Sequence, residues 1–373
     1  MFRLRKYLLI IFTLLLATPL FASHAISRDS VERLAARMLI VGFKGDTITH
    51  DNPVVSYLKD IKVGGIILFD IDLTGSRKLG SRNITSRPQL QKLTNDLRQV
   101  AGYPLVITAD QEGGLVQRLK PRYGYEAAPD ARSLGSTGSV DSTFHWSAVM
   151  ADQLKEAGVN LNLAPEVDIH NDNCPVIGGL DRAYSSDPDS VVLHASAAID
   201  AFHSRGIRAT LKHFPGHGSS TADSHYGLTD VTNTWNEKEL LPFKNLINAG
   251  KADAIMTAHI FNRNLDPDYP ATLSKKTITG LLRNQLGYNG VVITDDLYMQ
   301  GIIDNYDIAE ALILAINAGA DMIIVGNNIS TGFEPDRPAK LVNIIANGVE
   351  SGKIDIERLI EANKRIDTLL SAQ

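Results

Sequence analysis

Eight short apolar segments, separated by candidate helices, constrain the fold more than any other feature of this sequence. The segments are 38–43, 65–69, 105–109, 161–164, 209–214, 254–258, 291–294 and 322–325. Most are continuous and rich in β-branched residues, which is typical of strands buried on both faces of a parallel sheet. Helices are expected at 30–37, 88–100, 142–157, 188–205, 238–249, 275–286, 308–318 and 355–370. This alternation of strand and helix predicts the α/β class.

Eight strands without a clear break favour a closed barrel over an open sheet, so the sequence predicts a single-domain (β/α)8 TIM barrel over residues 26–373. The alternative is a doubly wound sheet, which needs a Gly-rich phosphate-binding turn after its first strand. The segment 41–45, VGFKG, does not supply that turn. The polar segment 70–87 is expected to form a long loop on the active-site face.

The N-terminus has the pattern of a secretory signal peptide, predicted to span residues 1–25. Arg3, Arg5 and Lys6 precede the apolar run 7–16, and small residues follow near Ala25. An uncleaved anchor is the alternative, but the run is shorter than the ~20 residues that a spanning helix needs. We therefore expect cleavage and no stable membrane anchor afterwards.

The cysteine content indicates the compartment of the protein, and the net charge indicates which partners it is not expected to bind. Cys174 is the sole cysteine, so no internal disulfide can form, and none lies near the cleavage region for lipid attachment. Export with one cysteine predicts a bacterial periplasmic or secreted protein. The net charge of -5 argues against a nucleic-acid partner, which would usually require a basic patch.

Polar side chains follow most of the later predicted strands. They are Asp110 and Arg118 after the third strand, Glu166 and Asp168 after the fourth, Lys212 and His213 at the end of the fifth, His259 after the sixth, and Asp295 and Asp296 after the seventh. In a barrel these strand ends converge on one pocket. Carboxylates, cations and histidines gathered there suit hydrolysis of a polar neutral substrate.

Asp295 is the candidate nucleophile. It follows the dry strand 291–293, and a carboxylate beside cations stays ionised at neutral pH. Such a group can attack a sugar C1 and form a glycosyl-enzyme intermediate. The alternative for this acidic pair is helix capping, and we expect Asp296 to take that role.

His225 is the candidate proton donor, because the ordinary pKa of histidine lies close to a neutral working pH. Asp223 could accept its ring N–H and set its tautomer. A metal site is the rival interpretation of this region, with His213, His217, Asp223 and His225 as ligands. Lys212 would repel a cation there, so we expect no metal.

Four motifs together resemble family 3 of the glycoside hydrolases. They are 110–119 (DQEGGLVQRL), 212–218 (KHFPGHG), 223–225 (DSH) and 287–297 (GYNGVVITDDL). The resemblance runs from about residue 30 to the C-terminus, and it is strongest to bacterial β-N-acetylglucosaminidases that act on peptidoglycan fragments.

The resemblance implies roles for individual residues. Asp295 matches the nucleophile, His225 the acid/base and Asp223 its partner. Substrate-binding positions are matched by Asp110, Arg118, Arg182, Lys212 and His213. Members of this kind need no metal or organic cofactor. The chain departs from the family pattern at four positions, Glu166, Ala183, Tyr184 and Ser185. It also departs in its predicted leader, since the well-known recycling enzymes of the family are cytoplasmic.

The sequence thus predicts a retaining exo-acting β-N-acetylglucosaminidase whose substrate is a carbohydrate such as a muropeptide. Two alternatives stay open. One is a phosphorylase or another β-glycosidase on the same site, because a histidine acid/base does not repel phosphate. The other is a non-catalytic sugar-binding envelope protein, because a fold does not fix a function.

Overall fold

The computed structural model describes residues 26–223, 227–329 and 332–371, and it contains the predicted barrel. Its strands are β1 (Leu39–Gly42), β2 (Gly65–Ile67), β3 (Val106–Ala109), β6 (Leu161–Asn162), β7 (Arg208–Phe214), β9 (Ala254–Thr257), β11 (Val291–Thr294) and β12 (Ile323–Val325). Paired neighbours are parallel, in the order β11-β9-β7-β6-β3-β2-β1-β12. The prediction of a (β/α) barrel is confirmed. The predicted signal peptide and His225 lie outside the described residues.

The barrel is nearly closed, and side chains help to close it. Between β11 and β12 there is one bridge, Ile293 to Met322. Asp321 Oδ2 accepts the Val292 N–H at 2.9 Å, and the Thr294 hydroxyl oxygen accepts the Ile324 N–H at 3.2 Å. These two side chains therefore help to join β11 to β12, where few backbone–backbone hydrogen bonds connect the two strands.

Helices surround the strands as expected from their apolar periodicity. The longer ones are α1 (Arg28–Arg37), α3 (Arg87–Ala101), α5 (Val140–Glu156), α6 (Pro188–His203), α7 (Leu241–Asn248), η6 (Lys276–Gln285), α9 (Ile308–Ala318), α10 (Arg337–Glu350) and α11 (Ile356–Ser371). The sequence analysis did not predict α10. The shorter helices α2 (Val54–Ser56), α4 (Ala131–Ser136) and α8 (Gln300–Ile303) lie in connections.

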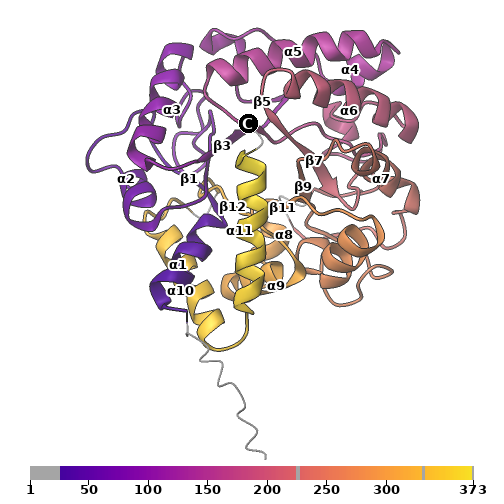
Figure 1. Cartoon of the computed structure of the whole chain (residues 1–373). Coiled ribbons are helices and arrows are strands. Elements are labelled where there is room, and N and C mark those ends of the chain that lie inside the picture. Colours follow the sequence, from indigo (N-terminus) through magenta and orange to yellow (C-terminus); the bar gives the residue numbers. More distant parts are fainter. Residues whose placement is uncertain (1–25, 224–226, 330–331, 372–373) are drawn as a thin grey trace, which may run out of the picture.

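Helices from the two ends of the chain lie side by side (Figure 1). Figure 1 shows α1 next to α10 and α11. Arg28 bonds to Glu350 at 2.8 Å, and Arg37 bonds to Asp367 at 2.5 Å. Ser27 caps α1 by accepting the Ser30 N–H, so the helix begins a few residues earlier than expected. The first described helix therefore packs against the last two.

The loop over 70–86 is fixed by buried polar contacts. Arg82, whose side chain is fully buried, donates to Asp72 Oδ1 at 3.1 Å and to the Asn327 carbonyl at 2.7 Å. The Leu73 N–H donates to Asn328 at 2.8 Å. These contacts attach the loop to the segment after β12, on the face where the strands end.

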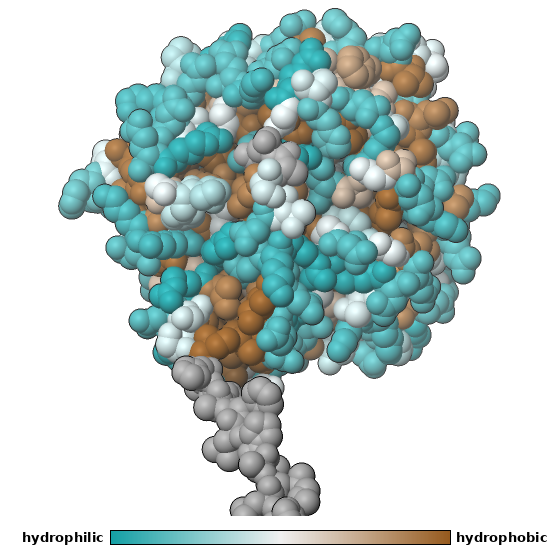
Figure 2. Space-filling model, viewed as in Figure 1, coloured by the Kyte–Doolittle hydropathy of each residue, from teal (hydrophilic) through white to brown (hydrophobic). Residues whose placement is uncertain are grey.

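The face of the molecule seen in Figure 2 is mostly hydrophilic, with hydrophobic residues gathered in separate patches. Among the described residues, no helix has both the length and the apolarity needed to cross a bilayer.

Candidate active site

A cavity of about 390 Å³ lies at the carboxyl ends of the barrel strands. Seven of the eight predicted site residues line it: Asp110, Arg118, Arg182, Lys212, His213, Asp223 and Asp295. The eighth, His225, lies outside the described residues. Of the polar residues expected where the strands end, six line the cavity, namely Asp110, Arg118, Lys212, His213, Asp295 and Asp296. Glu166, Asp168 and His259 are buried and are not among its lining residues.

Five charged side chains form a continuous chain of ion pairs along one wall, and we call this the charge chain. Asp110 bonds to Arg118 at 2.8 Å and to Lys212 Nζ at 3.0 Å. Lys212 Nζ also bonds to Glu112 at 2.7 Å. Glu112 then receives two hydrogen bonds from Arg182, at 2.8 and 2.9 Å. Positive and negative groups alternate, so each has an opposite charge beside it.

The charge chain keeps its carboxylates ionised. Burial would raise the pKa of Asp110, but Lys212 and Arg118 outweigh it and hold that pKa well below its ordinary value. Burial also opposes ionisation of Glu112, but Arg182 and Lys212 lower its pKa to about 2. Lys212 itself is only 2% exposed, and Glu112 and Asp110 raise its pKa in spite of burial. All three groups are therefore charged at neutral pH.

Glu112 is a site residue that the sequence analysis did not single out, although it stands inside the 110–119 motif. Its position depends on the hairpin of β4 (Gln111–Gly113) and β5 (Val116–Gln117). Gly113 has a φ of +97°, and a Cβ there would lie 2.3 Å from the Pro129 carbonyl oxygen. Glycine is therefore required at this turn, which directs Glu112 inward and returns the chain to Arg118.

His213 is held by Asp168, a strand-end residue that was expected near the pocket but was given no role there. His213 Nδ1 lies 2.8 Å from Asp168 Oδ2, and the His217 N–H donates to Asp168 Oδ1 at 2.7 Å. Asp168 is fully buried, which would raise its pKa, but the hydrogen bond from His213 outweighs this and lowers it to about 2. A charged carboxylate on Nδ1 fixes the ring and leaves Nε2 facing Arg182, at 3.4 Å.

Glu166, the departure from the family pattern, is buried beneath this pair. Its Oε1 accepts the Asp168 N–H at 2.5 Å. Burial, and then the charge of Asp168, raise its pKa well above the ordinary value. It is a buried partner of Asp168 and is not among the residues that line the cavity.

The two neighbouring acids after β11 have different surroundings. Both line the cavity, and Asp295 Oδ1 accepts the Asp296 N–H at 2.8 Å. Asp296 accepts the Tyr298 N–H and the Gly326 N–H, both at 3.0 Å. It therefore caps a turn and ties it to the end of β12, whereas α8 begins only at Gln300. Burial raises the pKa of Asp296 to about 6, and the charge of Asp295 adds to this.

The histidines proposed as metal ligands make other contacts where they are described. His217 Nδ1 lies 2.8 Å from the Ser220 hydroxyl, and burial lowers the pKa of His217 to about 4. Over residues 26–223, 227–329 and 332–371, no group of three or more candidate ligands could hold a metal ion.

Comparison with known proteins assigns the chain to a family. Residues 31–369 match the glycosyl hydrolase family 3 N-terminal domain. A β-hexosaminidase of Tolumonas auensis is 40% identical over 276 residues, covering 73% of this chain and 78% of that protein. A β-hexosaminidase of Xylella fastidiosa is 36% identical over 297 residues, covering 77% and 83%.

Solved structures agree with this assignment. A family 3 β-N-acetylglucosaminidase from a Paenibacillus species has a TM-score of 0.82 and 34% identity over 91% of this chain. The match spans 62% of that longer protein. A β-N-acetylhexosaminidase from Beutenbergia cavernae has a TM-score of 0.80 and 26% identity, covering 92% of this chain and 98% of the other.

Proposed function

The chain is a glycoside hydrolase that belongs to family 3, and on this premise we propose that it is a retaining, exo-acting β-N-acetylglucosaminidase. It removes terminal β-linked N-acetylglucosamine, with peptidoglycan fragments as the source of its substrate. The observation that carries the proposal is that Asp295 and Asp223 line the same cavity as the charge chain. The relatives named above, all hexosaminidases or acetylglucosaminidases, support the choice of sugar.

The cavity suits a small neutral sugar. The charge chain joins three cations to two carboxylates, and Asp295 and Asp223 add further carboxylates, so positive and negative groups nearly balance. Charged groups held in place can bind sugar hydroxyls without attracting an ionic substrate. Leu163, Val176 and Met256 are among the apolar lining residues, and they offer surface to the sugar ring and the acetamide methyl group.

The reaction follows the double-displacement route. Asp295 attacks C1 of the sugar, the bond to the leaving group breaks, and His225 protonates the departing oxygen. His225 then takes a proton from water, which attacks C1 and releases Asp295. Asp223 accepts the ring N–H of His225 and stabilises the imidazolium, as the carboxylate does in a hydrolytic triad. The charge chain and His213 hold the sugar during both steps.

Replacing the nucleophile tests the role of Asp295. Asp295→Ala should lower kcat on an aryl N-acetylglucosaminide by roughly 10⁴-fold or more, because the lost group acts mainly in the transition state. A fluorosugar that traps the intermediate should label Asp295. A folded variant with near-normal turnover, or label on Asp296 instead, would move the nucleophile elsewhere.

The dyad is tested with aryl leaving groups of different acidity. His225→Ala should slow substrates with poor leaving groups most, since a nitrophenolate needs little protonation. The glycosyl-enzyme intermediate should accumulate, because its hydrolysis still needs a base. The released aryl alcohol should therefore appear in an initial burst. Asp223→Asn should show a smaller defect of the same kind. An equal loss of turnover for all leaving groups, without a burst, would mean that His225 binds substrate and is not the acid/base.

Product analysis separates the alternatives that share this chemistry. Turnover with and without phosphate distinguishes a hydrolase from a phosphorylase. An aryl glucoside and an aryl xyloside test for another β-glycosidase. Purified muropeptides run beside chitin oligosaccharides identify the polymer, and faster release from muropeptides is the expected result.

A further inference from the structure

A turn outside the cavity contacts the loop that follows His213. The short helix η4 (Glu237–Leu240) and Trp235 before it lie against the segment 215–220, which we call the 215–220 loop. Trp235 Nε1 donates to the Pro215 carbonyl at 3.1 Å. The Ser219 hydroxyl donates to Glu239 Oε1. Two side chains of one turn thus hold the two ends of this loop.

The contact with Glu239 is close and buried. Glu239 is 2% exposed. A Cβ added to Gly216 would lie 2.4 Å from Glu239 Cβ and 2.5 Å from its Oε2, and Gly216 has a φ of +114°. Glycine lets the loop backbone approach the carboxyl group at a distance that no other residue allows.

The opposite side of the 215–220 loop rests on the segment after β6. The His217 N–H donates to Asp168 Oδ1, as described above. A Cβ on Gly218 would lie 2.0 Å from the Ile169 carbonyl oxygen. The loop is therefore enclosed between residues 168–169 on one side and Glu239 on the other, with little space to shift.

The 215–220 loop connects two groups of the cavity. It begins after His213 and leads to Asp223, both of which line the cavity. We propose that Glu239 is a positioning residue for the active site. It packs against the 215–220 loop, keeps that loop in contact with Asp168, and so fixes the positions of His213 and Asp223. The catalytic part of this inference rests on the proposed function.

Glu239 acts there as an uncharged group. Burial, and then the charge of Asp168, raise the pKa of Glu239 to about 8, although hydrogen bonds from Ser219 and from the Gly218 and Ser219 backbones oppose the shift. At neutral pH the carboxyl is mostly protonated. Glutamine, which has the same shape and no charge, should therefore replace it well.

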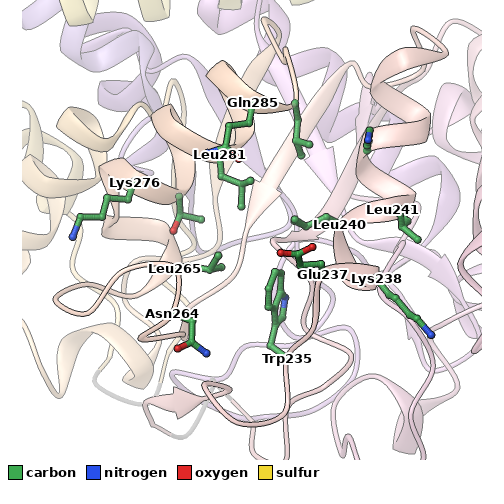
Figure 3. A pocket seen from close by; sticks show the side chains of 13 residues that line it. Trp235, Glu237, Lys238, Leu240, Leu241, Asn264, Leu265, Lys276, Leu281 and Gln285 are labelled. Carbon is green, nitrogen blue, oxygen red and sulfur yellow. The ribbon is translucent and has the colours of Figure 1, made fainter.

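The same turn offers a matched control. Glu237 lies two residues earlier and lines a groove of about 580 Å³ on the outside of the molecule. Figure 3 shows Trp235, Glu237 and Lys238 around this groove. Glu237→Ala therefore makes the same kind of truncation in the same turn, but on a side chain exposed to solvent.

The experiment compares kcat and KM of three variants on the aryl glycoside that wild type cleaves best. Glu239→Ala should lower kcat by roughly 10- to 100-fold at unchanged folded fraction, the loss expected when reacting groups are misplaced by about 1 Å. Glu239→Gln should stay within about threefold of wild type, as should Glu237→Ala. Wild-type kcat in folded Glu239→Ala, or a loss as large in Glu239→Gln, would overturn the proposal.

A second readout does not depend on catalysis. The chain has two tryptophans, so Trp146→Phe leaves Trp235 as the only one. In that background Glu239→Ala should shift the Trp235 emission, because the bond from Trp235 Nε1 to the Pro215 carbonyl reports the position of the loop. If Glu239→Ala does not fold, Ser219→Ala in the same background should give the smaller shift and lower kcat. An unchanged emission together with unchanged kcat in Ser219→Ala would also overturn the proposal.

If wild type cleaves no glycoside, the proposed function fails, and the emission test still decides the loop contact.

Discussion

Replacing Lys212 by methionine should destabilise the fold by an amount that depends on pH. Lys212 is 2% exposed and bonds to Asp110 and Glu112, so Lys212→Met leaves one partly buried and one buried carboxylate short of a cation. Removing one partner of a buried pair costs about 3–5 kcal/mol. Arg118 and Arg182 still contact the two acids, so we expect about 3 kcal/mol at pH 7, the lower end of that range.

The sign of the pH dependence follows from the depressed pKa values. Asp110 and Glu112 titrate lower in the folded chain than in the unfolded chain. Their stabilising effect is therefore complete above their ordinary pKa values and is lost as pH falls through the folded ones. In Lys212→Met the two acids become easier to protonate, which relieves the unpaired charge. The deficit should stay near its full size from pH 7 down to about 4 and should shrink as the pH falls from about 4 toward about 2.

Urea unfolding followed by circular dichroism, at several pH values, measures this deficit. The control is Lys340→Met. Lys340 lies 3.2 Å from Asp336, both side chains are exposed, and exposed pairs contribute about 0–1 kcal/mol. A deficit in Lys212→Met no larger than that of Lys340→Met, or one that does not change with pH, would refute the reasoning.

Two further predictions concern the loop and the leader. Gly218→Ala places a methyl group 2.0 Å from the Ile169 carbonyl oxygen, so it should lower the free energy of unfolding by about 1–3 kcal/mol in the urea assay; an unchanged midpoint would contradict the crowding seen there. The basic and apolar leader predicts export, so N-terminal sequencing of the protein from a periplasmic fraction should begin near Ile26. Full-length chain in the cytosol, with Met1 intact, would contradict that prediction.

The strands and most helices could be predicted because their signal is local. Continuous apolar runs identify strands buried on both faces, and each expected strand matches an observed one within a few residues. Helix α10 was missed although Leu341, Val342 and Ile345 have the spacing of a buried helical face. This apolar spacing is present in the sequence and is sufficient to predict the helix.

The supporting residues of the site could not be predicted in the same way. Glu112 depends on the direction of a hairpin turn, which glycine permits but does not specify. Asp168 contacts His213 across 45 positions of sequence, and Glu239 contacts Ser219 across 20. No local pattern contains these distances, because they arise from the packing of separate elements. Asp110, Lys212 and Asp295 were found because they lie at or near the ends of barrel strands, which a barrel brings together.

The pairing of β1 with β12 constrains when the nascent chain can complete its structure. During synthesis β1 leaves the ribosome first, and its neighbour β12 appears only after α9; Arg28 and Glu350, which later bond, are 322 positions apart. Until then one edge of β1 stays unpaired, and such edges are templates for aggregation. Contacts between distant parts of a chain also form slowly. A ribosome stalled after α9 would expose the edges of β1 and β11 together, because β12, which lies between them in the closed barrel, has not yet been added to the chain.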